Sequence, residues 1–296
     1  MTSDAVLILG GSSQLTPLLL KRIGPDSRIV ITTTSEGRRF HEWPNVTELA
    51  YPREAPDALA GKLDGSWKAV ISLVPVTALP QLLPALETAN IGRFIALSTA
   101  SVQTKVHTRS PAEAAFLESV KAGEAAFHAF TRAHAMPAVL LRPAMTYGGA
   151  DNNVGFIRRM GRGFGFFPVV SRSGMRQPVH VDDVVQAVMA ALTSAAAVGN
   201  TYFLGGGEQL TFEQMARRIL RDEVGHDRVV RLPAPVLTLA LRILSLIPRF
   251  RYLDSDMVRR MREDHVFDNE PAERDLGFTP QEFLAENARP PTDRNR

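Results

Sequence analysis

The 296-residue sequence contains no cysteine, which excludes disulfide bonds, thiolate catalysis and zinc or iron–sulfur sites with cysteine ligands. Its seven histidines show no H-E-x-x-H motif and no other close ligand spacing, so no metal site is predicted. No apolar run reaches the roughly 18 to 20 residues that span a bilayer, and no basic segment of a secretory signal precedes the first apolar run. The formal net charge of +3 gives no reason to expect nucleic-acid binding. We therefore expect a cytoplasmic protein.

Short β-branched runs alternate with longer helical patterns in the first half of the chain. The runs that predict strands are residues 5–10, 28–34, 46–51, 68–76, 93–101 and 138–144. Helices are predicted for residues 13–23, 78–90 and 111–134. Strands that are apolar on both faces and alternate with helices predict an α/β fold with a doubly wound, Rossmann-like parallel sheet. The ligand crevice of such a sheet lies at the carboxyl ends of its strands.

The second half indicates a smaller C-terminal substrate lobe packed over that crevice. We expect a strand running into a helix that Asp182 or Asp183 caps, a helix capped by Thr211, and an apolar helix over residues 234–248. The predicted organisation is a dinucleotide-binding domain of residues 1–150, a lobe of residues 151–286 interleaved with the main sheet, and a disordered tail of residues 287–296.

The first predicted strand ends in "GGSSQLTP", where a dinucleotide-binding fold keeps G-x-x-G-x-x-G. The three positions of that motif hold Gly10, Ser13 and Thr16, so only the first is glycine. Gly10 and Gly11 preserve the tight turn, and the Ser13 hydroxyl can donate to a phosphate at the N-terminus of the following helix. Thr16 is bulkier than glycine and is expected to displace the helix slightly. We predict that dinucleotide binding survives, the alternative being a serine-rich turn without a ligand.

Three further stretches carry a family resemblance: "FIALSTASV", "VLLRPAMTYGG" and "GMRQPVHVDDVVQA", followed near the end by "FDNEPAERDLGFTP". In this order they resemble the extended short-chain dehydrogenase/reductase family, in its NAD-dependent epimerase/dehydratase branch. The chain looks most like atypical members from bacterial cell-envelope gene clusters. It looks more distantly like the reductase-like accessory subunit of respiratory complex I, although a complex I role is not expected.

The resemblance implies a nicotinamide cofactor, and the end of the second strand favours NADP(H) over NAD(H). Uncharged Thr33, Thr34 and Ser35, followed by Arg38 and Arg39, replace the acidic residue that usually holds the ribose of NAD. Guanidinium groups suit a 2′-phosphate, whereas Glu36 argues against this preference. The complete set predicted to bind the cofactor is Gly10, Gly11, Ser12, Ser13, Gln14, Leu15, Thr33, Ser35, Arg38, Leu73, Val74 and Pro143.

The family's usual proton-transfer residues, a Ser or Thr followed by Y-x-x-x-K on the next helix, are incomplete. Thr99 falls at the Ser/Thr position, but Phe116 and Val120 take the tyrosine and lysine positions if Glu124 aligns with the family's glutamate. Lys121 is one residue off, about 100° around the helix. The candidates for a replacement are Thr99, Ser101, Lys105, Lys121 and Tyr147. Two alternatives stay open: hydride transfer assisted only by hydroxyls and water, and cofactor binding without turnover.

The second lobe contains the residues that indicate a substrate. The resemblance implies that Arg176 clamps a diphosphate and that Asn153 and Arg158, with Asn152, lie on the helix covering it, although Arg176 also fits a structural ion pair. His180 is expected to be structural. The apolar helix over residues 234–248, followed by basic residues, fits either a core helix or one resting on an anionic membrane.

We predict an NADP(H)-dependent oxidoreductase acting on a hydroxyl or ketone of a lipid-linked substrate (a polyprenyl-linked sugar or oxidised ceramide) or a nucleotide sugar. Peripheral contact with the inner membrane and a homodimer are further possibilities.

Overall fold

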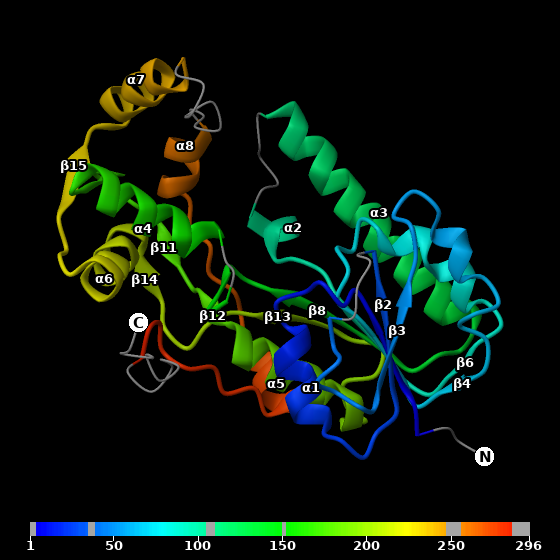
Figure 1. Cartoon of the computed structure of the whole chain (residues 1–296). Helices are drawn as coiled ribbons and strands as arrows, with labels where there is room; N and C mark the ends of the chain where they lie inside the picture. Colours follow the sequence, from blue (N-terminus) through cyan, green and yellow to red (C-terminus); the bar gives the residue numbers. More distant parts are fainter. Residues whose placement is uncertain (1–3, 35–38, 105–109, 150–151, 247–255, 286–296) are drawn as a thin grey trace.

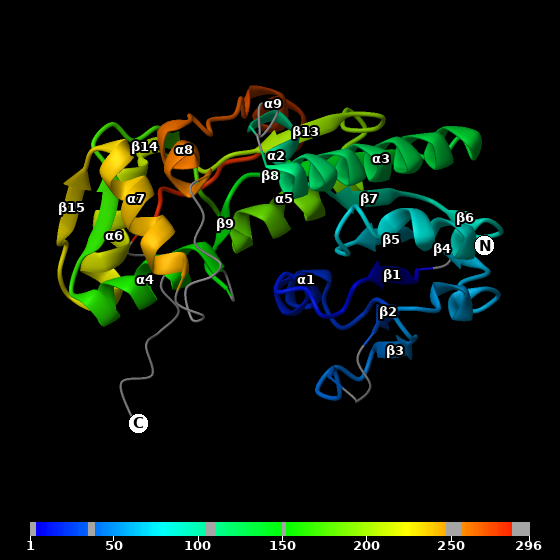
Figure 2. The same cartoon turned by 90° about the horizontal axis from the view of Figure 1, so that it is seen from above.

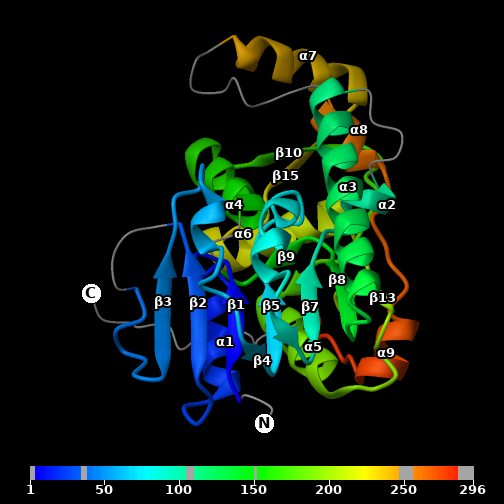
Figure 3. The ribbon, with the colours of Figure 1, turned by 90° about the vertical axis from the view of Figure 1, so that its right-hand side faces the viewer.

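A seven-stranded parallel sheet forms the centre of the structure, a computed structural model that describes residues 4–34, 39–104, 110–149, 152–246 and 256–285, with residues 152 and 153 described by their backbone only. The strand order is β13-β8-β7-β5-β1-β2-β3, and every neighbouring pair is parallel (Figure 3). The strands are β1 (Val6–Leu9), β2 (Ile29–Thr33), β3 (Val46–Ala50), β5 (Ala69–Ser72), β7 (Phe94–Leu97), β8 (Ala138–Pro143) and β13 (Thr201–Leu204). This order confirms the predicted doubly wound, Rossmann-like fold.

The strand sequences explain their places in the sheet. Each residue of β1, β2, β5 and β7 is buried, as expected of strands covered on both faces, whereas the edge strand β3 is only partly buried. The strand order reverses between β1 and β5, because β1 pairs with β2 on one side and with β5 on the other. In doubly wound sheets a ligand binds beyond the carboxyl ends of the two strands at such a reversal.

Helices cover both faces of the sheet (Figure 1). One layer consists of α1 (Thr16–Ile23), α5 (Val181–Thr193) and α9 (Glu270–Leu276). The other consists of α3 (Pro111–Ala133) and the 3-10 helices η1 (Pro56–Leu59), η2 (Leu79–Gln81) and η3 (Leu83–Leu86). The short strands β4 (Ser66–Trp67) and β6 (Asn90–Ile91) pair beside this layer. The second half of the chain thus supplies β13, α5 and α9 to the sheet and one of its layers.

The remaining elements form a second lobe beside the sheet (Figure 2). Its helices are α4 (Asn152–Phe164), α6 (Phe212–Val224), α7 (Ala234–Ser245) and α8 (Asp256–Arg262), and the short helix α2 (Ser101–Thr104) follows β7 on the sheet side. Its strands pair as β10 (Phe167–Val170) with β15 (Val229–Leu232) and β11 (Met175–Arg176) with β14 (Leu210–Thr211). A separate apolar core, which includes Phe167, Met215, Ile219 and Leu237, holds this lobe together. The pair β9 (Thr146–Tyr147) with β12 (Val179–His180) lies where the two parts meet.

Two local predictions were wrong. Residues 78–90 form η2, η3 and the strand β6 instead of one helix, because Pro80 and Pro84 each remove a backbone donor and each occupies the start of a short 3-10 helix. Neither Asp182 nor Asp183 caps α5. The helix begins at Val181 and its N-cap is His180, whose ring accepts a hydrogen bond from the Asp182 N–H at 3.3 Å. The capping of α6 by Thr211 is confirmed, with Gln214 completing a capping box.

Within the described residues, no helix has the length and apolarity needed to cross a membrane. The same part of the chain contains no group of three or more His, Cys, Asp or Glu residues that could hold a metal ion.

Candidate functional site

The turn between β1 and α1 packs against β2 and against the segment that follows β5. Gly10 has φ +98°, and its N–H and that of Gly11 both donate to the Thr32 carbonyl, at 3.2 and 2.8 Å. A Cβ atom on Gly10 would approach Val74 to 2.9 Å, and one on Gly11 would approach Ile31 to 2.6 Å. Both positions therefore require glycine, because any side chain would lift the turn off the sheet.

Thr16 replaces the third glycine of the motif with a hydrogen bond. Its side chain is fully buried, and its hydroxyl lies 3.5 Å from the Gly10 carbonyl, to which it donates. The turn is further closed by the Ser13 N–H, which donates to that same carbonyl at 3.1 Å. The threonine thus connects the start of α1 to the first residue of the turn, where a glycine would allow only close packing.

The donors exposed by this turn fit a pyrophosphate. Ser12 is exposed and its hydroxyl accepts from Arg39 Nη1 at 3.0 Å, so a guanidinium group lies at the turn. Ser13 and Gln14 are half-buried, and the Ser13 hydroxyl accepts from the Leu15 N–H at 3.3 Å. Among the described residues, the buried Gln14 Oε1 has no hydrogen-bond partner. Hydroxyl groups and a positive charge at a helix N-terminus are the chemistry that a diphosphate group needs, whereas Gln14 Oε1 is an acceptor and does not contribute to it.

The residues predicted at the adenosine end are only partly described. Thr33 is 2% exposed at the end of β2, so its side chain faces the protein interior. Ser35 and Arg38 lie outside the described residues. Arg39, the next residue in the sequence, is described, and its guanidinium group contacts Ser12 of the predicted cofactor turn.

A pocket of about 590 Å³ lies between the carboxyl end of the sheet and the second lobe. Thr99, Ser101, Pro143 and Thr146 line it from the sheet side. Its wall also contains four of the nine methionines of the chain and three phenylalanines: Met145, Met215, Met257, Met261, Phe156, Phe212 and Phe267. Sequence reasoning missed these apolar residues, because they come from α4, α6 and α8 and from isolated loop positions, and no single helical face contains them.

Two hydroxyl groups meet where β7 ends at the pocket. Thr99 Oγ1 donates to Ser101 Oγ at 3.0 Å and accepts from the Ser101 N–H at 3.2 Å. Leu73 and Val74, which follow β5, are 9% exposed each, and the Leu73 N–H donates to the Leu9 carbonyl at 2.8 Å. The structure therefore brings Thr99, Ser101 and Pro143 together at one pocket, with Leu73 and Val74 following a strand that adjoins β7 in the sheet.

Helix α3 contributes no tyrosine or lysine to this pocket. Phe116 is 44% exposed and Val120 is buried in the protein. Lys121 is exposed and pairs at 2.8 Å with Glu118 of the same helix. Of the described residues of α3, the pocket wall includes only Glu113, which forms an ion pair with Arg260 of α8. Lys105 lies outside the described residues.

A largely buried ion pair contacts Ser98, the residue before Thr99. Glu124 of α3 is buried and accepts from Arg142 of β8 twice, from Nε at 2.9 Å and from Nη2 at 2.5 Å. The Ser98 hydroxyl donates to the same carboxylate at 2.5 Å. The Arg142 guanidinium also lies 5.2 Å from the centre of the Phe203 ring. This cluster fixes the end of β7, and with it the backbone that carries Thr99, against α3 and β8.

Tyr147 lies behind the pocket wall. Its side chain is buried, and its hydroxyl donates to the Glu282 carbonyl at 3.2 Å and accepts from the Leu284 N–H at 3.1 Å. Burial raises the pKa of Tyr147 to about 12, which disfavours proton transfer near neutral pH. His180 packs edge-on against the Tyr147 ring at 5.1 Å, and burial lowers the pKa of His180. This arrangement fits the structural role expected for His180.

Arg176 lies at the pocket but uses its guanidinium group on backbone carbonyls. Nη1 donates to Met175 and Glu263, at 2.7 and 2.6 Å, and Nη2 donates to Arg260 at 2.5 Å. Burial lowers the pKa of Arg176 to about 10. Arg158 pairs with Glu223 of α6 at 3.1 Å, and its side chain is not in the pocket wall that the described residues form. The side chain of Asn153 lies outside the described part of the structure.

These observations define a class: an α/β protein with a glycine turn at the switch point of its doubly wound sheet and a second lobe beside the sheet. Residues 75–205 match the model of the NAD dependent epimerase/dehydratase family. This match confirms the family resemblance of the sequence motifs and supports an NAD(P)-dependent enzyme.

Solved structures of epimerases and dehydratases share the fold. UDP-glucuronic acid 4-epimerase from Bacillus cereus, solved with UDP-glucuronic acid and NAD, superposes with a TM-score of 0.71 at 14% identity over 96% of each chain. The dTDP-glucose 4,6-dehydratase DesIV from Streptomyces venezuelae, solved with NAD, gives a TM-score of 0.71 at 17% identity over 95% of this chain and 94% of its own. At these identities the likeness establishes the fold.

One curated relative matches a shorter part of the chain. It is the mitochondrial NADH dehydrogenase (ubiquinone) 1 alpha subcomplex subunit 9 of Arabidopsis thaliana, 34% identical over 107 residues. The match covers 35% of this chain and 26% of that subunit, so the chain spans about a quarter of this relative.

Proposed function

We propose that the protein is an NADP(H)-dependent oxidoreductase that acts on a hydroxyl or ketone of a lipid-linked substrate. The observation that carries this proposal is the pocket, because it joins the Thr99–Ser101 hydroxyl pair to a wall of four methionines and three phenylalanines. A polar reacting group can lie at the hydroxyl pair while an apolar chain lies against the methionines, whose flexible side chains adapt to irregular apolar ligands.

The cofactor is assigned to the turn between β1 and α1. Gly10, Gly11, Ser12, Ser13 and Gln14 would hold its diphosphate, and a bound nicotinamide supplies hydride exchange with a carbon atom of the substrate. The preference for NADP(H) is supported by Arg39 at Ser12 and by the absence of an acidic residue at position 33. Ser35 and Arg38, which lie outside the described residues, are part of this proposal.

Thr99 and Ser101 are the groups assigned to the substrate oxygen. Thr99 Oγ1 already accepts from the Ser101 N–H and donates to the Ser101 hydroxyl, so the orientation of the pair is fixed before a ligand arrives. A hydroxyl that donates to the substrate oxygen stabilises the charge that develops there during hydride transfer. Because α3 brings neither tyrosine nor lysine to the pocket, the proposal assigns the proton to this hydroxyl pair or to water.

A nucleotide sugar is the alternative substrate, since the solved relatives bind such ligands. Two observations favour the lipid-linked class instead. Arg176, the predicted diphosphate clamp, donates to three backbone carbonyls, and Arg158 pairs with Glu223. A diphosphate would have to displace these partners before either guanidinium could bind it.

A cofactor-binding protein without turnover is the second candidate function. The observation that favours it is the altered α3, with Phe116 exposed, Val120 buried and Lys121 paired with Glu118 on the surface. The two candidates agree on dinucleotide binding and differ in whether the bound cofactor is consumed.

Titration of the purified protein with NADPH and NADH, followed by nicotinamide fluorescence, tests both candidates. We expect saturable binding of both cofactors, with a lower Kd for NADPH than for NADH. The absence of a saturable signal with either cofactor would refute both candidate functions. Cofactor consumption is then measured with membrane-lipid extracts and, in parallel, with UDP- and dTDP-sugars. Consumption with lipid extracts alone supports the proposal. Consumption with UDP- or dTDP-sugars indicates that the substrate is a nucleotide sugar. Cofactor binding without consumption supports the second candidate.

A further inference from the structure

Helix α7 presents an apolar stripe to solvent on the side opposite its core contacts. Leu237 and Leu241 are 1% and 6% exposed and belong to the core of the second lobe, together with Met261 and Phe167. The other face carries Val236, Leu239, Ile243 and Leu246, with exposures of 50%, 60%, 58% and 79%. Their spacing of three, four and three residues puts them on one side of a helix. We call these four residues the α7 stripe.

The stripe is unusual for this protein. The described part of the chain contains nine exposed large apolar side chains, and four of them lie on this one helix and its C-cap residue. Single exposed apolar residues are normal on a protein surface, but a contiguous patch of this kind marks an interaction surface.

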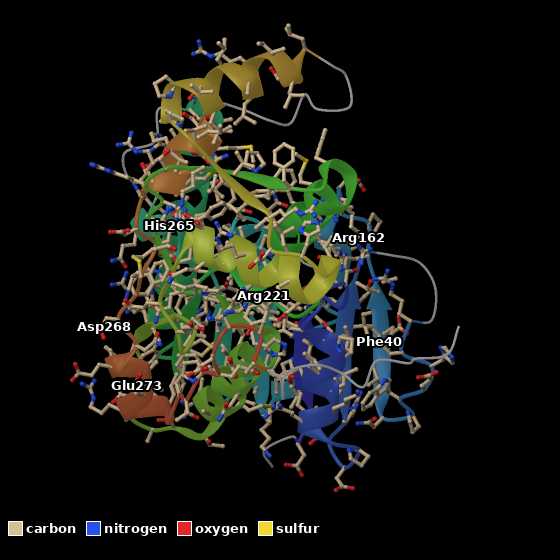
Figure 4. The ribbon with its side chains drawn as sticks, turned by 90° about the vertical axis from the view of Figure 1, so that its left-hand side faces the viewer. Phe40, Arg162, Arg221, His265, Asp268 and Glu273 are labelled. Atoms are coloured by element: carbon tan, nitrogen blue, oxygen red, sulfur yellow. The ribbon has the colours of Figure 1, made fainter. Side chains whose placement is uncertain are left out.

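Helix α7 lies at the outer end of the second lobe, above α8 (Figures 1 and 3). Figure 4 shows its side chains along the upper edge of the molecule. The helix contacts β10 and α8, and α8 carries Met257, Arg260 and Met261 of the pocket wall. A surface that bound the stripe would therefore be separated from the pocket by one helix.

The charged residues in the sequence segment that contains the stripe all have one sign. Residues 228–246 contain Arg228, Arg231 and Arg242 and no acidic residue. All three arginines are exposed, and Arg231 pairs with Glu213. An exposed apolar stripe beside arginines is complementary to a bilayer with anionic headgroups. The apolar side chains can insert among the acyl chains, and the headgroup phosphates attract the guanidinium groups.

We propose that the α7 stripe is a docking surface for an anionic lipid bilayer. The helix lies in the plane of the interface, because its 12 residues span only about 18 Å and do not cross a bilayer. Val236, Leu239, Ile243 and Leu246 enter the headgroup region, and α8 carries the pocket behind them. The role of this surface in delivering a lipid-linked substrate rests on the proposed function, whereas the docking itself does not.

Vesicle flotation of the full chain tests the proposal. Vesicles of phosphatidylcholine alone are compared with vesicles that also contain phosphatidylglycerol, using the wild type and the double variant Leu239→Gln/Ile243→Gln. Both side chains are more than half exposed, so the change leaves the core intact. Wild type is expected to bind the anionic vesicles, and the double variant to lose at least about tenfold in partitioning, because two large apolar side chains no longer enter the interface.

Two further variants separate the contribution of charge to vesicle binding from that of the apolar side chains. Arg242→Gln is expected to lower partitioning into anionic vesicles about fivefold and to leave neutral vesicles unaffected. Val198→Gln is the matched control, since Val198 is also apolar and exposed, at 39%, but lies between α5 and β13. It is expected to bind as the wild type does.

A Leu239→Trp variant locates the contact independently of any loss of binding. Its emission is expected to shift to the blue with anionic vesicles and to be quenched by brominated lipids. Failure of the wild type to float with anionic vesicles overturns the proposal, and so does equal binding by the double variant. A wild-type dimer that the double variant dissociates, without vesicle binding, assigns the stripe to a second copy of the chain and also overturns it. NADPH binding is measured on the same samples, so that loss of the proposed function and loss of docking are recorded separately.

Discussion

Replacing Glu124 by glutamine removes one charge from the largely buried cluster at Ser98 without changing its shape. Glutamine keeps one acceptor oxygen, but the Arg142 guanidinium loses the carboxylate that binds it at 2.9 and 2.5 Å. Breaking a buried pair on one side costs about 3–5 kcal/mol. Because the Arg142 side chain is 23% exposed, water recovers part of that cost, and we expect about 2–4 kcal/mol. For 296 residues this lowers Tm by roughly 3–7 °C.

Thermal and urea unfolding of the wild type and of Glu124→Gln measures this loss. Lys121→Gln is the matched control on the same helix, because Lys121 and Glu118 form a pair at a similar distance with both side chains more than half exposed. An exposed pair contributes at most about 0.5 kcal/mol. A double-mutant cycle with Arg142→Met should give a coupling energy of at least about 1 kcal/mol. If Glu124→Gln and Lys121→Gln unfold at the same temperature, the cluster does not stabilise the end of β7 and the reasoning fails.

Four other variants test the site. Arg39→Ala should weaken NADPH binding about ten- to hundredfold, as expected for loss of a charged hydrogen bond, with NADH affected less; an unchanged NADPH/NADH ratio would refute the cofactor preference. Thr99→Val should lower kcat about a hundredfold at unchanged cofactor affinity, and full activity would exclude Thr99. Tyr147→Phe should cost about 1–3 kcal/mol of stability, because two backbone partners are left unsatisfied, and should leave kcat unchanged. Burial lowers the pKa of His180 below its unfolded value, so the stability that the neutral ring contributes is present above about pH 6.5 and is lost as the pH falls. His180→Asn, which keeps a capping acceptor, should therefore show a shallower loss between neutral and acidic pH, by at most about 1.4 kcal/mol per pH unit.

The layout of the sheet could be predicted because local signals and global fold agree there. Val6–Leu9, Ala69–Ser72 and Phe94–Leu97 are apolar throughout, and the structure buries each of them on both faces. The cap of α6 is equally local, since Thr211 and Gln214 stand three residues apart. Where two local signals competed, the prediction failed: prolines at positions 80 and 84 outweighed the apolar pattern of a helix.

The candidate site was less predictable, because its contacts are distant in the sequence. Arg176 meets the carbonyls of Arg260 and Glu263, more than 80 residues away, and nothing near position 176 indicates this. The apolar part of the pocket wall comes mainly from single residues on α4, α6 and α8, beside polar residues such as Glu113, Arg176 and His265, so no periodic pattern shows it. By contrast, the exposed position of Lys121 agrees with its displacement by one residue from the family's lysine position.

Strand β13 has a consequence for how the chain can be divided. It is an edge strand from the second half, and it supplies the hydrogen-bonding partner of β8 along Leu140–Pro143. A fragment that stops near residue 150 would leave β8 as an open edge with buried apolar residues on it, a surface prone to pairing with other chains. Aggregation of such a fragment, and rescue when residues 181–204 are supplied in trans, would show that the sheet of the first half is completed only by a strand from the second half.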